Sequence, residues 1–138
     1  RFALDAHSWE CPEGGGPKEG DPLDTARREL AEETGWRAET YQKICSFDVS
    51  NSVTDEQAVG YLATGLAPGA PDRDPSEADM DVCRIPFHQA YAMAMSGEIR
   101  DGFSIILLSA TAHTARTGGL DRALAARMLP DEFAGAAP

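Results

Sequence analysis

The stretch "RRELAEETGW", residues 27–36, carries the strongest signal for the fold of this chain. Its glutamates Glu29, Glu32 and Glu33 are three and four residues apart, so a helix would place them side by side. Like charges at this spacing repel, at a cost of roughly 0.2–0.5 kcal/mol per pair. The cluster therefore either needs a counter-charge or tolerates the repulsion in water.

The residues around this stretch predict where the helix begins and ends. Asp21 is a suitable N-cap, Pro22 suits the first helical position, and Gly35 suits a C-cap. The residues expected on the face away from Glu29 and Glu33 are Leu23, Ala26 and Leu30. Such a helix buries its apolar face and directs its glutamates toward a cleft.

Apolar patterns predict the remaining elements. The expected strands are 38–48, 56–65 and a short one at 80–87, and the expected helices are 87–94, 103–110 and 120–128. Residues 1–11 read as extended segments, and a Gly-rich loop follows them. Strands and helices mix without a strict alternation, which favours an α/β fold in which helices cover a mixed β-sheet.

Length and charge narrow the class of protein. The 138 residues suit a single domain over 1–138, with a helical C-terminal tail at 116–138 that is interpreted as a packing or dimer helix. The formal net charge of −11 argues against nucleic acid or an anionic membrane as a partner. A phosphate substrate would then need a divalent cation to offset the acidic charge.

The three cysteines, Cys11, Cys45 and Cys83, show no metal-ligand spacing. They are interpreted as small buried residues of a reduced, cytoplasmic protein. No apolar run is long enough to span a membrane, and no signal peptide is recognised. The chain opens at Arg1 in a strand-like segment, so part of an N-terminal β segment is expected to be missing from this numbering.

Gly14 and residues 28–36 resemble the Nudix box, G-x5-E-x7-R-E-U-x-E-E-x-G-U, in which U is an apolar residue. "WECPEG" at 9–14 is similar to a segment of the ADP-ribose pyrophosphatase branch, and 85–110 is similar to the C-terminal helices of that branch. The likeness covers most of 1–112. It implies a Nudix-type α/β/α sandwich with a mixed β-sheet. It also implies hydrolysis of the pyrophosphate in a small-molecule nucleoside diphosphate derivative, such as ADP-ribose or another nucleotide sugar.

The resemblance also implies roles for individual residues. Glutamates that match Glu29, Glu32 and Glu33 hold Mg²⁺ or Mn²⁺ in the family, and the main-chain carbonyl at Glu13 adds a ligand. Carboxylate oxygens suit these hard cations, which agrees with the implied role. Arg28 matches an arginine that orients a catalytic glutamate, so Arg28 and Glu32 are predicted to be catalytic positions.

Residues of three segments are candidates for the substrate. The predicted substrate-binding residues are Trp9, Glu10, Gly14, Gly15 and Glu56. The ring of Trp9 could stack on a base, and core packing is the alternative. Glu56 matches an acidic residue of the branch's substrate loop, and the alternative is a plain turn formed by Asn51 and Asp55.

Two positions depart from the family pattern. The box has glutamate where this sequence has Gly20, and Glu19 stands one residue earlier. Either Glu19 reaches the same place from a flexible loop, or its interaction with the box arginine is lost. The branch's general base falls at Ala78, so Glu77, or otherwise Asp79, is predicted to be the base, with an acidic loop of no catalytic role as the alternative.

These observations support a Mg²⁺-dependent pyrophosphohydrolase as the first hypothesis. The alternative is a catalytically impaired Nudix-fold module that binds a nucleotide sugar, which Gly20 and Ala78 favour and the three glutamates oppose. An acidic scaffold without a ligand is a third hypothesis. A homodimer is expected, because the N-terminal β segment helps to form the dimer in the branch that this chain resembles.

Overall fold

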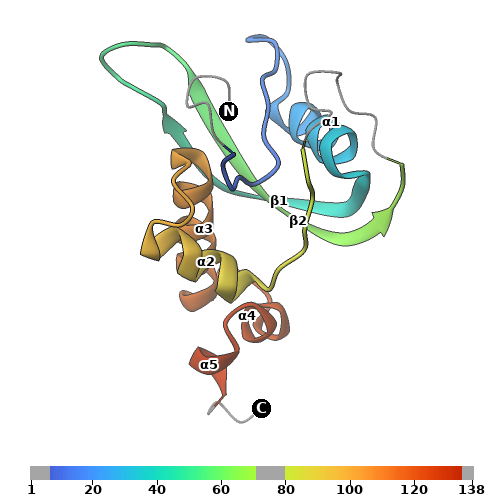
Figure 1. Cartoon of the computed structure of the whole chain (residues 1–138), viewed down its shortest axis with the longest axis vertical. Helices are drawn as coiled ribbons and strands as arrows, with labels where there is room; N and C mark the ends of the chain where they lie inside the picture. Colours follow the sequence, from blue (N-terminus) through green and yellow to red (C-terminus); the bar gives the residue numbers. More distant parts are fainter. Residues whose placement is uncertain (1–6, 71–79, 135–138) are drawn as a thin grey trace. The chain divides into compact units, whose positions relative to one another are not determined.

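The computed structural model describes residues 7–70 and 80–134 (Figure 1). The chain divides into two compact units, one formed by residues 11–83 and the other by residues 1–10 with 84–138. The single domain over 1–138 stays a prediction.

The first unit combines one helix with a long β-hairpin. Its elements are α1 (Pro22–Thr34), β1 (Trp36–Asp48) and β2 (Gln57–Pro68). The strands pair antiparallel from Trp36 opposite Pro68 to Asp48 opposite Gln57, with an irregularity between Lys43 and Cys45. Both predicted strands are therefore confirmed, and each extends two or three residues beyond its predicted range at one end.

The predicted ends of α1 are confirmed in detail. The Asp21 carboxylate accepts a hydrogen bond from the Leu23 N–H at 2.9 Å. Gly35 has a φ of 75°, the left-handed conformation that glycine adopts without strain, and its N–H donates to the Ala31 carbonyl at 2.9 Å. The helix contacts both strands of the hairpin (Figure 1), and this contact holds its glutamate face in place.

The predicted fold class is confirmed as helices combined with an antiparallel sheet. The short strand expected at 80–87 is wrong, because residues 80–86 carry no strand and Phe87 begins a helix. Val82 and Ile85 are exposed there, so no burial favours an extended pairing. Residues 7–11 likewise form no strand among the described residues, and residues 1–6 of that extended prediction lie outside them.

The second unit contains helices only, in its described part. They are α2 (Phe87–Ser96), α3 (Gly102–Arg116), α4 (Arg122–Met128) and α5 (Pro130–Phe133). Three of them were predicted, and α5 was not. Small residues form much of the core here, since Ser104 and Ala112 are completely buried and Ala125 is nearly so. Small side chains allow helix backbones to approach one another closely.

The C-terminal tail packs onto the preceding helix. α4 contacts both α3 and α5, and the Arg116 guanidinium forms two bonds to the Glu132 carboxylate, at 2.7 and 2.6 Å. The same guanidinium lies over the Tyr91 ring, 5.1 Å from its centre. The hydrogen bonds to Glu132 raise the pKa of Arg116, and the hydrogen bond from Arg116 lowers the pKa of Glu132. The tail therefore packs within its own unit, and its interpretation as a packing or dimer helix stays a prediction.

The cysteine prediction is partly wrong. Cys83 is exposed, and Cys11 and Cys45 are only half-buried, so none of the three is a core residue. No disulfide joins them. Within the described ranges, every helix is too short or too polar to cross a bilayer.

The ion pair at α5 predicts a pH-dependent stability. Because the folded pKa of Glu132 lies below its unfolded value, the stabilisation is complete above the unfolded pKa and is lost as the pH falls through the folded pKa. Glu132→Gln should therefore lower the melting temperature slightly at pH 7 and leave it unchanged at pH 2. Asp131→Asn, one residue earlier, is the matched control. An equal loss at both pH values would contradict the ion-pair explanation.

Candidate active site

The Gly-rich loop approaches α1 through alternate glycines. A Cβ added to Gly14 would lie 2.0 Å from Glu29 Oε1, and one added to Gly16 would lie 2.1 Å from Thr25 Oγ1. A Cβ added to Gly15 would meet nothing within 4 Å. Alternate residues of an extended segment face opposite sides, so Gly14 and Gly16 face the helix while Gly15 faces open space. A side chain at Gly14 or Gly16 would overlap the Glu29 or Thr25 side chain unless that side chain or the loop shifted.

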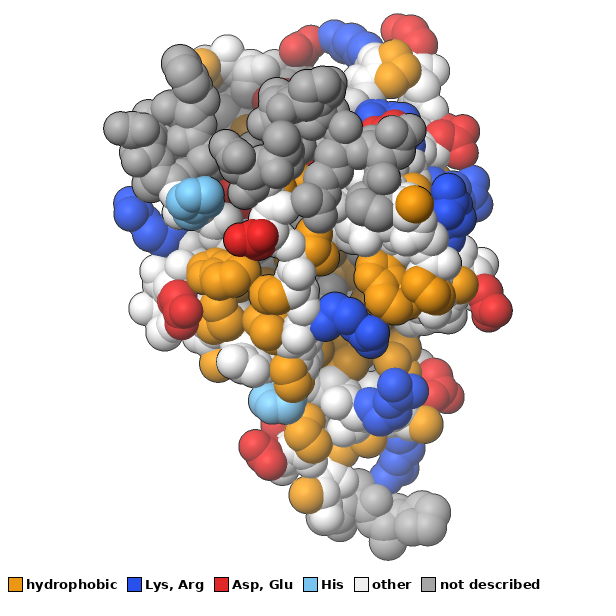
Figure 2. Space-filling model, turned by 45° about the vertical axis from the view of Figure 1, so that its right-hand side comes forward, with side chains coloured by type: hydrophobic (Ala, Val, Ile, Leu, Met, Phe, Trp, Pro, Cys, Tyr) orange, Lys and Arg blue, Asp and Glu red, His pale blue; other side chains and the backbone are white. Residues whose placement is uncertain are grey.

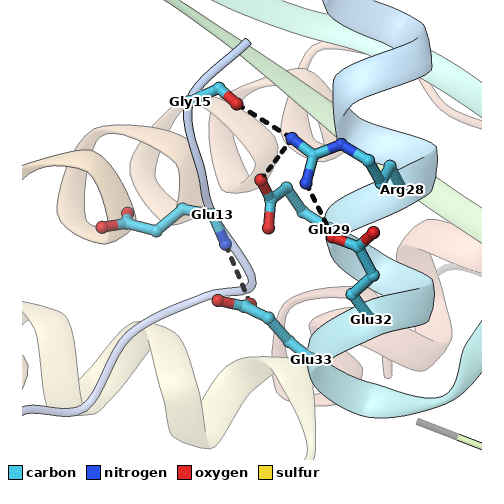
Figure 3. Close-up of polar contacts among 6 residues, drawn as sticks. All are labelled: Glu13, Gly15, Arg28, Glu29, Glu32 and Glu33. Atoms are coloured by element: carbon cyan, nitrogen blue, oxygen red, sulfur yellow. Dashed lines mark hydrogen bonds and ion pairs between the residues drawn. The ribbon is translucent and has the colours of Figure 1, made fainter. Parts of the chain in front are cut away.

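Arg28 joins the loop to two of the predicted metal ligands (Figure 3). Its Nη1 donates to Glu32 Oε2 at 2.6 Å, and its Nη2 donates to Glu29 Oε1 at 2.7 Å. Nη2 also donates to the Gly15 carbonyl at 2.9 Å. One side chain thereby satisfies two carboxylates of the helix and one carbonyl of the loop.

Burial differs sharply across this group of residues. Glu29 is the buried residue of α1, and its side chain is 11% exposed, whereas the side chain of Arg28 is 45% exposed. The hydrogen bond to Glu32 is the largest cause that raises the pKa of Arg28, and the charge of Glu29 adds to it. A buried carboxylate is costly unless it is paired, so Arg28 supplies the counter-charge that the glutamate cluster requires.

Glu33 turns to a different part of the loop. Its Oε2 accepts a hydrogen bond from the Glu13 N–H at 3.2 Å. The side chain of Glu13 points away from α1 (Figure 3), which leaves the main chain as its contribution on this side. The backbone of Glu13 therefore lies next to Glu33. The role of the Glu13 carbonyl as a metal ligand stays a prediction.

The donor set fits a divalent cation by its chemistry. Three carboxylates lie on one helix turn beside a loop whose backbone approaches them without Cβ atoms, and hard cations favour such oxygen donors. Among residues 7–70 and 80–134, no three acidic, His or Cys side chains converge as a formed metal site. The contacts explain the difference: Glu29 and Glu32 turn toward Arg28, and Glu33 turns toward the loop.

Gly20 lies in the same hollow as Arg28. The hollow, of about 270 Å³, is lined by Pro17, Gly20, Asp21, Asp24, Thr25 and Arg28. The φ of Gly20 is outside the left-handed region, but a Cβ there would lie 2.8 Å from Pro17 Cγ. Glu19 is exposed, and the contacts of Arg28 in the described structure go to Gly15, Glu29 and Glu32 instead.

The connection between β1 and β2 is tied to the Gly-rich loop. Lys18 forms an ion pair with Asp55, 37 residues away, a separation at which the sequence gives no local signal. Glu56 is exposed, and its backbone closes the hairpin by accepting from Val49 N–H at 3.0 Å. The residues 51–53 form turns, as the alternative for this segment expects, while the substrate role of Glu56 stays a prediction.

Two predicted substrate residues belong to the other compact unit. Trp9 is 47% exposed, so the alternative of core packing is wrong for this side chain. Glu10 is half-buried. Glu77, Ala78 and Asp79 lie outside the described residues, so the structure does not locate the predicted general base.

Comparison with known proteins places this geometry in a family. The NUDIX domain model matches residues 2–103. The chain belongs to the Nudix family. This Nudix chain is 38% identical over 112 residues to the ADP-ribose pyrophosphatase of Mycobacterium tuberculosis (strain ATCC 25618 / H37Rv), a match that covers 80% of this chain and 54% of that protein.

Other relatives of the Nudix chain carry a different substrate in their names. It is 33% identical over 84 residues to the GDP-mannose pyrophosphatase of Enterobacter sp. (strain 638), over 59% of this chain and 44% of that protein. The GDP-mannose pyrophosphatase of Yersinia pestis (strain Pestoides F) is 34% identical over 85 residues, covering 59% and 42%. The chain spans about half the length of the curated relatives it matches.

Membership of the family supports a divalent metal ion as the cofactor, because Nudix hydrolases generally use divalent metal ions. The choice of Mg²⁺ or Mn²⁺ stays a prediction. The box residues are also the ones that the structure brings together: Gly14 and Gly15 on the loop, and Arg28, Glu29, Glu32 and Glu33 on α1. The ion pair between Arg28 and Glu32 could be predicted from their i, i+4 spacing on a helix. The bond from Arg28 to Gly15 had no such local signal.

The loop contact leads to a test with a built-in control. Gly14→Ala places a methyl group against the buried Glu29 carboxylate, so that carboxylate must leave its bond to Arg28 or the loop must move, and the free energy of unfolding should fall by about 1–3 kcal/mol. Gly15→Ala meets open space and should leave it nearly unchanged. Urea denaturation of both variants measures the difference. Equal stability of the two variants would show that Gly14 is not needed for the close approach.

Proposed function

We propose that this chain is a Nudix pyrophosphohydrolase that cleaves the pyrophosphate of a nucleoside diphosphate derivative, such as ADP-ribose or another nucleotide sugar. The observation that carries the proposal is the glutamate turn of α1, which lies against a glycine loop and is joined to it by Arg28. The relatives are named for ADP-ribose and GDP-mannose, and these two compounds define the class of molecule to test.

The reaction balances as a hydrolysis. The oxygen of a water molecule forms a bond to one phosphorus, the bond from that phosphorus to the bridging oxygen breaks, and the water loses a proton. A Mg²⁺ or Mn²⁺ ion, when bound, would neutralise pyrophosphate oxygens and lower the pKa of the attacking water. ADP-ribose would yield AMP and a sugar phosphate.

Different residues of the chain are proposed to bind the cation, to catalyse the reaction and to bind the substrate. Glu29, Glu32 and Glu33 would hold the cation together with the Glu13 carbonyl. Glu32 is the proposed catalytic glutamate, and Arg28 is the arginine proposed to orient it. Gly15 faces open space and leaves room for an anionic substrate beside the helix. Trp9 and Glu10 are proposed to bind the nucleoside, and the exposed ring of Trp9 is available to stack on a base.

Two further proposals complete the site. Glu56 is proposed to contact the substrate from the connection between β1 and β2. Glu77, or otherwise Asp79, is proposed to take the proton from water, on the basis of the family resemblance.

A catalytically impaired nucleotide-sugar binding module is the second candidate. The absence of a side chain at Gly20 favours it, because Arg28 is left with the helix glutamates and the loop carbonyl as its partners among the described residues. A module of this kind would keep the glutamates and the fold. Its signature would be a higher melting temperature with a nucleotide sugar and no turnover of that compound.

The decisive experiment is a substrate screen with a matched pair of variants. ADP-ribose, GDP-mannose, dinucleotides and nucleoside triphosphates are incubated with Mg²⁺ or Mn²⁺, and released products are measured. Glu33→Gln removes an anionic ligand with little change of shape and should lower turnover on the order of 100-fold or more. Glu39→Gln, an exposed change on β1, should leave turnover unchanged.

The outcomes separate the two candidates. Turnover that Glu33→Gln abolishes supports the hydrolase. Wild-type turnover in Glu33→Gln contradicts the role of that carboxylate. No turnover, with a nucleotide sugar that raises the melting temperature, supports the binding module.

We also propose a cytoplasmic homodimer. The cytoplasmic location rests on three cysteines that form no disulfide. Large apolar side chains stay exposed in the described parts of the chain (Figure 2), among them Met95 at 53% and Ile106 at 40%, and these can contribute to an interface. Sedimentation at micromolar concentration should detect a dimer, and a monomer alone would contradict this prediction.

A further inference from the structure

Two of the three glutamates in the proposed cation site, Glu29 and Glu32, already form ion pairs with the Arg28 guanidinium. Glu32 Oε2 lies 2.6 Å from Arg28 Nη1, and Glu29 Oε1 lies 2.7 Å from Arg28 Nη2. These charge-assisted bonds engage one oxygen of each carboxylate, and carboxylate oxygens are also the ligands that a hard divalent cation prefers. A guanidinium and a divalent cation also repel each other at such short range, so the two cannot share both carboxylates without rearrangement.

We propose that Arg28 is an internal counter-ion that competes with the divalent cation for Glu29 and Glu32, and so sets the cation concentration at which the site fills. This inference rests on the proposed function, because it concerns the same glutamates. Arg28 acts here as a positioning residue, through the carboxylates that it holds.

The structure provides space for the guanidinium to leave its partners. Arg28 lines the hollow of about 270 Å³ beside Gly20, Asp21 and Asp24, and its side chain is 45% exposed. The Asp21 carboxylate caps α1, and the Asp24 carboxylate binds Arg27. Because Gly20 has no side chain, the hollow offers Arg28 no additional carboxylate at that position.

The neighbouring arginine provides a matched control. Arg27 carries the same charge one residue earlier on α1, but it binds Asp24 at 3.1 Å and lies over the Tyr41 ring, 5.5 Å from its centre. Among the described residues these contacts of Arg27 are with Asp24 and Tyr41, and not with the glutamate trio. Removing Arg27 therefore tests the general effect of one lost positive charge, and removing Arg28 adds the release of two carboxylates.

The experiment measures Mn²⁺ binding to the metal-free full chain by calorimetry. The Arg28–Glu32 pair is partly exposed and such pairs are weak, whereas the Arg28–Glu29 pair is mostly buried on the glutamate side. Arg28→Gln releases both carboxylates and should tighten Mn²⁺ binding by about three- to tenfold. Arg27→Gln should change it by less than about twofold. Arg28→Lys, which keeps the charge and loses the fork that reaches both carboxylates, should lie between wild type and Arg28→Gln. Circular dichroism confirms that each variant is folded.

A second pair of variants tests the same competition without changing Arg28. Gly20→Glu offers the guanidinium another carboxylate across the hollow and should tighten Mn²⁺ binding. Gly20→Ala introduces the same close contact with Pro17 but no charge, and should not. In the Arg28→Gln background Gly20→Glu should add nothing, because the partner that it attracts is gone.

The outcomes distinguish this inference from the proposed function. If Glu33→Gln does not weaken Mn²⁺ binding to the wild-type chain, the proposed cation site is wrong and the inference falls with it. If Glu33→Gln weakens binding but Arg28→Gln and Arg27→Gln have equal effects, the site stands and the competition is overturned. If Arg28→Gln does not fold, Arg28→Lys and the Gly20 pair decide by the same criteria.

Discussion

The bridge that Arg28 forms between α1 and the Gly-rich loop is the interaction on which the site depends. It pairs the buried Glu29, the half-exposed Glu32 and the Gly15 carbonyl with a single guanidinium. Without that charge, burial of the Glu29 carboxylate would be strongly unfavourable. The bridge therefore allows α1 to bury the Glu29 carboxylate beside the Gly-rich loop.

The glycines of the loop are the second constraint, and they make the bridge possible. Because Gly14 and Gly16 lack Cβ atoms, the backbone comes close enough for Arg28 to reach the Gly15 carbonyl. At its other end the loop carries Lys18, which forms an exposed and therefore weak ion pair with Asp55 of the hairpin connection. The Nudix box of this chain therefore supplies both the glycines that let the loop approach α1 and the charged side chains that join the two.

The C-terminal tail adds structure beyond the matched region. The NUDIX domain model ends at residue 103, within α3, and α4 and α5 lie entirely after it. Ala115, Ala125 and Leu129 are almost completely buried, so the tail is part of the core of its unit. The two-bond contact between Arg116 and Glu132 then fixes the last short helix.

Signals between neighbouring residues were enough to predict several elements of the fold from the sequence. Asp21, Pro22 and Gly35 defined α1 because caps depend on backbone conformation within a few residues, and the motif spacing identified the Nudix family. The tertiary structure alone decided which groups meet. It buried Glu29, turned Gly14 toward the helix, and directed Arg28 to a carbonyl thirteen residues away. It also left residues 80–86 without a strand and Cys83 exposed. Partners distant in sequence are chosen by packing, which periodicity within one segment does not encode.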